Sequence, residues 1–384
     1  MNITPPATSF DTKPKNSASK LNGTDIQREP PVEYLGYTEP QGTKYVYSSF
    51  EFWTSGFFPG CLYALYQRQR KYPAYFPEAA DGKPQIHPLK LQCACKWWTS
   101  NLHSQASRKD THDLGFMIQP WAQICWGIDR DPGCLSSLVT AAHMLGGRWD
   151  TCRTKRYSFD NPKKDFLVII DNMCNLDLLY YVTEMTSEPK LANIATTHAL
   201  TTLASHIRPD FSTYHVVNFD QNSSCPGVIK ERLTSRGYSD NSCWSRGQAW
   251  AILGYTQCYR RTKYYLFLET AQHLAEYFIS HLSADRVPDT SAALIAAYGM
   301  LLRHEARPGD STLINYMREA LISDKVGEKD VQVDMGSGAG AIILNATINN
   351  FEFAPRRCAD HGLVYADYFF LLIGNKLIEM GVFG

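Results

Sequence analysis

Apolar residues recur three and four positions apart along most of the chain, the spacing that gives an α-helix one apolar face. Around residues 213–219, alternating and β-branched residues instead predict a hairpin. Residues 166–181 are apolar on nearly every side, which predicts a helix buried all round. Helices are predicted over residues 61–70, 89–104, 121–128, 134–145, 166–181, 191–206, 251–259, 264–281, 291–304, 312–322 and 362–380.

Six apolar helices are each preceded by a polar or aromatic cluster, near residues 53, 113, 171, 244, 289 and 362. These starts are separated by 45 to 73 residues, which indicates a repeat of helix pairs without obvious sequence identity. We therefore predict an all-α fold, an (α/α)6 toroid or barrel of six helical hairpins, with the polar clusters at one mouth. A stacked solenoid of helix pairs gives the same spacing and stays open as an alternative.

The composition changes near residue 45. Residues 1–45 are rich in turn formers such as Pro5, Pro30 and Gly36, and they predict a flexible or poorly defined N-terminal segment. Residues 46–384 carry the helical pattern and predict a single (α/α)6 barrel catalytic domain. The twelfth helix of such a barrel would have to come from the N-terminal segment, where the helical pattern is weak.

Charge and composition argue against several classes of function. The 384 residues are 44% hydrophobic and 20% charged, with 38 basic and 38 acidic side chains, as in an ordinary soluble protein. No basic patch interleaves with aromatic residues, so nucleic acid is not an expected partner. The sequence shows neither a signal peptide nor an apolar stretch of membrane-spanning length, so we expect a cytoplasmic protein without a membrane partner. The oligomeric state is not predicted.

The cysteines do not indicate a metal site. Eleven is an odd number, and Cys93 with Cys95 forms a C-x-C pair without a second pair or a pair of histidines. We therefore predict no zinc, no disulfide framework and no cofactor.

The stretch 238–250 combines helix-start chemistry with side chains suited to sugars. Residues 240–242, Asp-Asn-Ser, are helix-capping types, so a helix is predicted to begin here with its positive end facing outward. Arg246 can hold a carboxylate through two hydrogen bonds, and Trp244 and Trp250 offer flat apolar faces on which sugar rings stack. The combination predicts a pocket for an acidic sugar. The alternative is a core helix whose arginine lies over a packed tryptophan.

Two aspartates begin predicted inner helices and would face one cavity. Burial beside aromatic rings would raise the pKa of a carboxyl group and let it act as a general acid, so Asp113 and Asp171 are candidate catalytic residues. Asp113 is equally well explained as a helix N-cap. Asp171 follows four apolar residues, where an ionised carboxylate is costly, and Asn175 one turn on could hydrogen-bond to it. His112 and His215 could donate to a sugar, although a lone histidine is more often a satisfied polar residue.

Seven motifs, in order along residues 45–381, resemble glycoside hydrolase family 88, the unsaturated glucuronyl hydrolases. They are Trp53-Thr-x-Gly-Phe, His112-Asp113-x-Gly-Phe, Ile170-Asp171-Asn-Met-x-Asn-Leu-x-Leu-Leu, Ser212-Thr-Tyr-His215, Tyr238-Ser-Asp-Asn-Ser-x-Trp244-x-Arg246-Gly-Gln-Ala-Trp250, Asp289-Thr-Ser-Ala-Ala and Tyr365-Ala-Asp-Tyr-Phe. The resemblance implies an (α/α)6 barrel without a metal. It also implies removal of a 4,5-unsaturated glucuronyl residue from the non-reducing end of oligosaccharides that polysaccharide lyases produce.

The chemistry that this resemblance implies is hydration of the C4=C5 double bond, to which the carboxyl-separation rule for glycosidases does not apply. Asp171 would deliver a proton to C4 and activate the water that adds at C5. Asp113 would position or polarise the reacting groups, and the resulting hemiketal would open and release the aglycone. By their places in the motifs, the residues that would line the sugar site are Trp53, His112, His215, Trp244, Arg246 and Trp250.

The sequence departs from the family pattern at several places. Arg236 stands where a glutamine commonly precedes Gly-Tyr-Ser-Asp, so this wall of the sugar site, and with it the substrate preference, is expected to differ. The chain is shorter than the pattern around Trp149, a candidate stacking residue, and before Asp289. Residues 355–361 lack the serine and lysine pattern by which relatives hold sulfate, which favours unsulfated substrates.

Two other functions stay open. The unsaturated rhamnogalacturonyl hydrolases share the barrel and the hydration chemistry, but they carry Arg-Gly-Asn-Gly-Trp where this chain has Arg246-Gly-Gln-Ala-Trp250. A catalytically inactive sugar-binding barrel is suggested by the missing loops.

Overall fold

A computed structural model describes residues 29–40, 44–76, 86–148, 165–220, 227–281, 289–307, 340–351, 353 and 358–382. The elements named below belong to one compact unit, Pro31–Gly384. Trp149 and the predicted helix 312–322 lie outside the described residues. Within the described ranges, no helix is long and apolar enough to cross a membrane.

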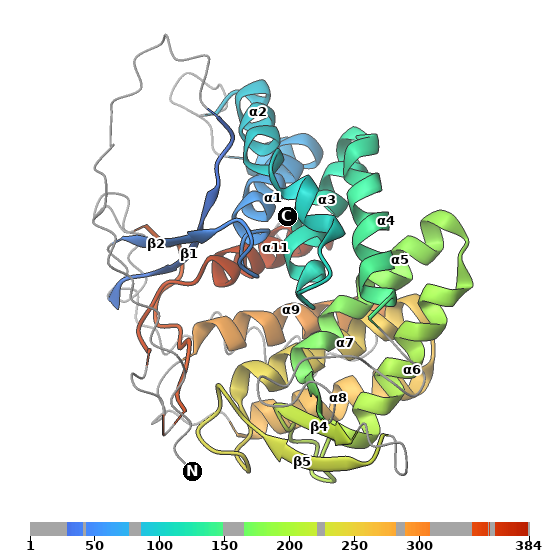
Figure 1. Cartoon of the computed structure of the whole chain (residues 1–384). Helices are drawn as coiled ribbons and strands as arrows, with labels where there is room; N and C mark the ends of the chain where they lie inside the picture. The colour runs from blue at the N-terminus through green and yellow to red at the C-terminus, as the bar shows by residue number, and fades with distance from the viewer. Residues whose placement is uncertain are drawn as a thin grey trace. The chain divides into compact units, whose positions relative to one another are not determined.

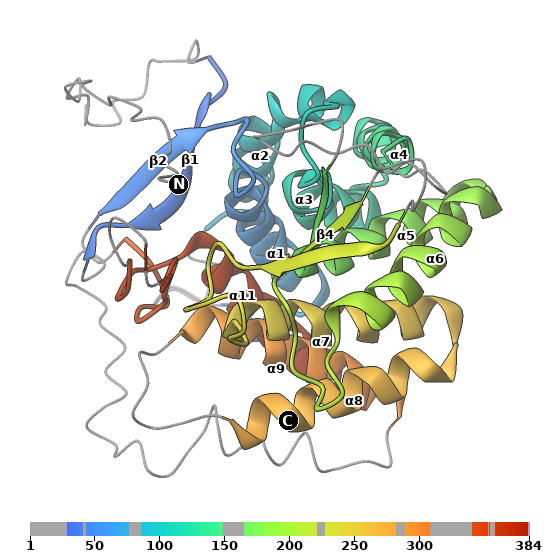
Figure 2. The same cartoon turned by 60° about the horizontal axis from the view of Figure 1, so that its bottom comes forward.

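The helices of this unit form a closed ring (Figures 1 and 2). They are α1 (Phe57–Lys71), α2 (Pro88–Thr99), α3 (Leu114–Asp129), α4 (Pro132–Gly146), α5 (Leu176–Thr186), α6 (Pro189–His206), α7 (Ser245–Thr262), α8 (Tyr265–Ser280), α9 (Thr290–Ala306) and α11 (Val364–Glu379). Each odd-numbered helix packs against the next odd-numbered one, and α11 packs against α1. Helices α2, α4, α6 and α8 pack on the outside, each against the helix before it. The ring confirms the predicted (α/α)6 barrel, whereas a solenoid would leave its first and last helices apart.

In three of the helix pairs, the inner helix ends at a residue in the left-handed conformation. Helices α3, α5 and α7 end at Arg130, Ser187 and Lys263, which adopt the left-handed conformation with φ of 53°, 59° and 58°. Pro132 and Pro189 then occupy the first turns of α4 and α6, where a missing N–H has no cost. These short links lay each outer helix back along its inner partner. The N-terminal ends of the inner helices therefore share one end of the ring.

One predicted helix is partly a strand. Residues 166–169 belong to β3 (Asp165–Ile169), which pairs antiparallel with β4 (Val216–Asp220), and β4 pairs with β5 (Ile229–Leu233). A 3-10 helix, η4 (Ile170–Asn175), follows β3, so the α-helix begins only at residue 176. A short run of apolar and β-branched residues is ambiguous by periodicity, and pairing with the predicted hairpin strand decides it here. The expected hairpin thus becomes a three-stranded sheet that delivers residue 171 to the ring.

The ordered unit begins before the predicted boundary at residue 45. Strand β1 (Glu33–Thr38) pairs with β2 (Tyr45–Ser49), and Thr38 exchanges hydrogen bonds with Gly362 beside the start of α11. The Tyr45 hydroxyl donates to the buried Asp367 carboxylate at 2.7 Å. Residues 33–38 and Tyr45, which belong to the segment predicted to be flexible, are therefore paired and anchored to a barrel helix.

Gly115 and Asn175 lock the first turn of α3 against η4. The Gly115 N–H donates to Asn175 Oδ1 at 3.0 Å, and a Cβ on Gly115 would lie 2.3 Å from that same oxygen. The prediction that Asn175 would hold Asp171 is wrong, because its amide oxygen faces Gly115 instead. This contact sets the approach of the segments that carry Asp113 and Asp171.

We expect Gly115→Ala to lower the free energy of unfolding by on the order of 1–3 kcal/mol, because the added methyl group overlaps Asn175 Oδ1 and α3 must shift. The control is Gly127→Ala in the same helix, where an added Cβ meets nothing within 4 Å. That control should be neutral or stabilising by up to about 1 kcal/mol. Chemical unfolding of both variants provides the measurement, and equal effects would contradict the proposed lock.

Candidate active site

Polar side chains from different inner helices gather at the end of the ring where those helices begin. Asp113, Trp244 and Asp289 are the N-cap residues of α3, α7 and α9, and Asp171 lies in η4 just before α5. The positive charge of Arg246, in the first turn of α7, lowers the pKa of Asp171, and the charge of Asp113 raises it. The predicted gathering of acidic side chains and Arg246 at one mouth agrees with these positions.

Asp171 is a buried carboxyl group without a fixed partner. Only 16% of its side-chain surface is exposed, and within the described residues no group donates a hydrogen bond to its Oδ2. Burial raises the pKa of Asp171 to about 7, against the lowering effect of Arg246. A carboxyl group of this kind can both give and accept a proton near neutral pH.

His215 faces Asp171 as a neutral imidazole. The Ser235 N–H donates to Nδ1 at 3.2 Å, so Nδ1 is an acceptor and the ring proton is on Nε2. Burial lowers the pKa of His215 to about 3, and the charges of Arg236 and Arg246 lower it further. Nε2 lies 4.0 Å from Asp171 Oδ2, too far for a hydrogen bond. A hydroxyl group of suitable position can therefore accept from Nε2–H and donate to the carboxylate.

Asp113 differs from Asp171 because it is already paired. The Thr111 hydroxyl donates to Asp113 Oδ2 at 3.1 Å, and His112 Nε2 lies 3.2 Å from Oδ1. The side chains of His112 and Asp113 are 18% and 21% exposed. His112 therefore lies at the predicted site as a partner of Asp113, whose charge is held toward Asp171.

The predicted caps of α7 are wrong. The helix begins at Ser245, and its N-cap is Trp244, which makes no side-chain capping bond. Asp240 Oδ1 instead accepts from the Thr234 N–H at 2.7 Å, and Ser242 Oγ accepts from Ser239 N–H. Capping residue types stabilise tight loops as well as helix ends, which is why the sequence pattern misplaced them. The resulting loop, residues 234–242, carries the exposed Arg236.

Arg246 is committed to the protein's own groups. Nη1 donates to Asp289 Oδ2 at 3.2 Å, to Ser291 Oγ at 3.3 Å and to the Thr347 carbonyl, and Nη2 donates to the Ile348 carbonyl at 2.9 Å. The residue is 4% exposed. Through Nη1 and Nη2 the guanidinium thus ties α7 to α9 and to residues 347–348. The predicted grip of Arg246 on a ligand carboxylate stays a prediction.

Arg246 also lies over an aromatic ring, as the core-helix alternative expected. Its guanidinium carbon is 4.7 Å from the Trp244 ring centre and 5.5 Å from that of Tyr365. The Trp244 ring in turn lies 4.5 Å from the His215 ring. Trp244 therefore lies between the arginine and the histidine that faces Asp171.

The two other predicted tryptophans have different surroundings. Trp53 is half-buried and lies 5.2 Å from the Tyr365 ring and 5.8 Å from the Phe116 ring, beside the start of α3. Trp250 is 1% exposed and packs 5.1 Å from Phe116, inside the helix ring. Trp53 is thus placed to present a ring edge or face at the mouth, whereas Trp250 belongs to the core, against the prediction that it lines the sugar site.

Sequence reasoning missed three residues that build the site. Asp289, Ser291 and Tyr365 contact Arg246 through an ion pair, a hydrogen bond and a ring face. Asp289 was recognised as a helix start and as part of a motif but was given no role, because an N-cap pattern carries no information about a partner 43 residues earlier in the chain. A buried arginine in an apolar helix is the one signal that could have called for a carboxylate.

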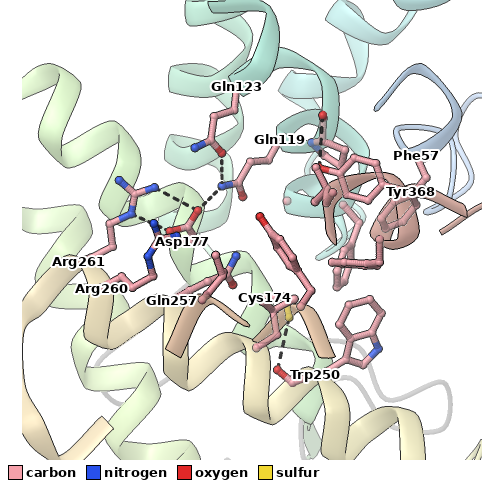
Figure 3. Close-up of a pocket in the computed structure, with 18 residues that line it drawn as sticks. Phe57, Gln119, Gln123, Cys174, Asp177, Trp250, Gln257, Arg260, Arg261 and Tyr368 are labelled. Carbon is pink, nitrogen blue, oxygen red and sulfur yellow. Dashed lines mark hydrogen bonds and ion pairs between the residues drawn. The ribbon is translucent and has the colours of Figure 1, made fainter. Parts of the chain in front are cut away.

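A cavity of about 140 Å³ lies among the inner helices (Figure 3). Its lining includes Phe116, Trp250 and, in the last turn of α7, Arg261. There Asp177 accepts from Arg261 Nε at 2.7 Å and from Gln119 Nε2 at 2.6 Å. The lining residues do not include Asp113 or Asp171, so this cavity is distinct from the candidate active site.

One group of potential metal ligands lies elsewhere. The ligand atoms of Cys125, Asp131 and Cys134 are within 4.8 Å of one another, between the end of α3 and the start of α4. These residues come from neither the predicted catalytic motifs nor the ends of the inner helices at the mouth.

Comparison with known proteins adds independent support. No family model matches the chain. The unsaturated glucuronyl hydrolase of Formosa agariphila is 32% identical over 340 residues, which cover 83% of this chain and 78% of that protein. The unsaturated chondroitin disaccharide hydrolase of Streptococcus agalactiae is 25% identical over 364 residues, covering 88% and 86%. A crystal structure of an unsaturated glucuronyl hydrolase specific for heparin matches with a TM-score of 0.75 and 28% identity over 92% of both chains.

We expect Asp171→Asn to stabilise the protein increasingly as pH rises. The pKa of about 7 in the folded state exceeds the unfolded value of about 3.9, so the wild type loses stability between these pH values and the asparagine does not titrate. The gain above pH 7 should be on the order of 1–4 kcal/mol. Unfolding of both proteins at pH 5 and pH 8 measures it, and a difference independent of pH would contradict the burial of this charge.

We expect Asp289→Asn to destabilise the protein by on the order of 3–5 kcal/mol, because it leaves the buried Arg246 charge without a carboxylate. The matched control is Glu305→Gln, which removes a partly exposed carboxylate that lies 3.0 Å from both Arg260 Nη2 and Lys376 Nζ. That change should cost no more than about 1 kcal/mol. Thermal unfolding compares the two, and similar losses would refute a structural role for the buried pair.

Proposed function

Because the chain belongs to glycoside hydrolase family 88, the unsaturated glucuronyl hydrolases, we propose that it removes the 4,5-unsaturated glucuronyl residue from the non-reducing end of lyase-generated oligosaccharides. The reaction is hydration of the C4=C5 double bond. The partner is an unsaturated uronic-acid oligosaccharide. The expected cytoplasmic location stays a prediction.

Asp171 carries this proposal, because its carboxyl group is unpartnered at Oδ2 and its pKa is raised to about 7 by burial. In the first step the protonated carboxyl transfers its proton to C4, and positive charge develops at C5 and the ring oxygen. The carboxylate that results takes a proton from the water attacking C5. Asp171 thereby regains its proton, and the hemiketal product opens with release of the aglycone.

The neighbours of Asp171 support these two proton transfers. His215 presents a neutral Nε2–H at 4.0 Å from the carboxylate, so it can hold a substrate hydroxyl or the attacking water without competing for the proton. The negative charge of Asp113 raises the pKa of Asp171 and stabilises positive charge that develops in the sugar ring. Trp53 and Trp244 offer apolar faces at the same mouth.

The test follows the loss of ultraviolet absorbance of the conjugated double bond. We expect wild type to consume unsaturated disaccharides. Asp171→Asn should lose at least about 10³-fold in kcat, because no other group supplies the proton. Asp113→Asn should retain more activity than Asp171→Asn. Sustained turnover by Asp171→Asn would disprove the assigned proton donor. Both variants keep the side-chain shape, so circular dichroism should match wild type.

The choice of substrate distinguishes the proposed function from the two alternative functions. Disaccharides derived from chondroitin, gellan and pectin distinguish a glucuronyl from a rhamnogalacturonyl hydrolase, and they include both sulfated and unsulfated sugars. Binding without loss of absorbance on any of them would indicate an inactive sugar-binding barrel. Preference for the unsulfated sugars would agree with the pattern in residues 355–361.

A further inference from the structure

The turn between α3 and α4 brings two buried cysteines together. Cys125 lies near the C-terminal end of α3, and Cys134 lies in the first turn of α4. Their Sγ atoms are 2.7 Å apart, and the two residues are 0% and 2% exposed. Both are free thiols in the structure, and the proposed function uses neither of them.

The backbone of this turn is fixed at several points. Arg130 ends α3 in the left-handed conformation, and its N–H donates to the Trp126 carbonyl at 3.2 Å. Asp131 caps α4, because its Oδ1 accepts from the Gly133 N–H at 2.9 Å. The two cysteines therefore meet because the turn holds the helix ends in place.

The short distance between the sulfurs favours a covalent bond over a shared metal ion. A disulfide bond is about 2.05 Å long, so the sulfurs need to approach by less than about 1 Å. Two thiolates bound tetrahedrally to zinc at about 2.3 Å would instead lie about 3.8 Å apart. Asp131, the third possible ligand, already holds Gly133 through Oδ1, and its Oδ2 lies 3.7 Å from Lys96 Nζ.

The two thiols also differ in acidity. The Cys134 thiol donates to Cys125 Sγ, and this hydrogen bond lowers the pKa of Cys125 against the effect of burial. A hydrogen bond with Tyr63 lowers it further. The same sulfur–sulfur contact, together with burial, raises the pKa of Cys134. Because the thiolate is the attacking form, Cys125 is the sulfur suited to react first.

We propose that Cys125 and Cys134 form an intramolecular disulfide bond that ties the C-terminal end of α3 to the N-terminal end of α4. This inference is independent of the proposed function. The cysteine pattern argued against a framework of several disulfides, but a pair brought together by a helix turn is not visible in the spacing alone.

The oxidant for this bond is another disulfide, either a small one such as oxidised glutathione or one carried by an oxidoreductase. The Cys125 thiolate attacks one sulfur of the oxidant, whose S–S bond breaks to release a first thiol. Cys134 loses its proton and attacks Cys125 Sγ in the mixed disulfide, which releases the second thiol. The two cysteine protons end on the two released thiols, and two electrons pass from the cysteines to the oxidant.

Burial determines when the bond can form. Tyr63 of α1 hydrogen-bonds to Cys125, and Cys95 of α2 interacts with it electrostatically, so other helices cover the pair in the folded protein. Exchange is therefore expected during folding, before these helices pack. A bond made at that stage is then shielded from reductants in the folded state.

The experiment refolds the full chain in a buffer of reduced and oxidised glutathione, alkylates the remaining thiols and digests the protein with trypsin. Cleavage after Lys109, Arg130 and Arg148 places Cys125 and Cys134 in separate peptides, residues 110–130 and 131–148. Neither peptide contains another cysteine, so a joined pair identifies the bond uniquely. We expect mass spectrometry to recover the two peptides joined and to find them separate after reduction.

Thermal unfolding gives a second measurement. Wild type refolded in the glutathione buffer should have a Tm on the order of 3–5 °C above wild type refolded in reductant, because the bond restricts the unfolded chain. Cys134→Ala should show no difference between the two buffers. Comparing each protein with itself removes any stability that the substitution costs. Cys93→Ser, which removes an exposed cysteine of α2, is the control and should keep the wild-type difference.

Three results would overturn the proposal. Recovery of both peptides with alkylated cysteines from the glutathione buffer would show that the bond does not form. A peptide joined through Cys95 in place of either cysteine would show a different pairing. Free thiols together with one equivalent of zinc by elemental analysis, after refolding with zinc present, would identify a metal site in place of the bond.

Discussion

The contact between Gly115 and Asn175 is the constraint on which the site depends. It joins the start of α3 to the 3-10 turn that precedes α5, with backbone and amide oxygen close enough to leave no room for a side chain. Each partner lies two or four residues from a catalytic candidate, so the contact fixes how Asp113 and Asp171 face each other. The strand β3 holds the other end of that turn. Because the turn is held at both ends, the carboxyl group keeps its position although no described residue donates a hydrogen bond to its Oδ2. That oxygen is therefore available for chemistry.

A second constraint is electrostatic. The Arg246 charge is buried with Asp289, and the same charge limits how far burial raises the pKa of Asp171. Without a cation nearby, a carboxyl group as buried as this one would hold its proton too firmly to act as an acid. Without burial, the group would already have lost its proton before the reaction began. A pKa of about 7 is the balance of these two effects. In the proposed reaction the arginine therefore acts from inside the wall, through its charge and through the backbone carbonyls that it holds.

Periodicity predicted the helix pairs, whereas closure into a ring was one of two arrangements that their spacing allowed. It failed for residues 166–169, where a short apolar run fits a strand as well as a helix and only the partner strand decides. The motifs that contain Asp113, Asp171 and His215 do come together at one end of the ring, while the catalytic and binding roles of these residues stay predictions. Side-chain direction was not predictable: Trp250 and Arg246 lie in the right helix, yet one packs in the core and the other turns to Asp289. Such choices depend on contacts between segments far apart in sequence, which a local pattern does not encode.

The closure of the ring has a consequence for how the protein is made. Helix α1 meets α11 through contacts such as Arg68 Nε with Asn375 Oδ1, which are 307 residues apart in sequence. During synthesis, the flank of α1 that packs against α11 stays uncovered until α11 has left the ribosome. Such late, long-range closure slows folding and exposes apolar surface in the meantime. A nascent chain of this kind is a natural client for chaperones, even though each of its helical hairpins forms from local contacts.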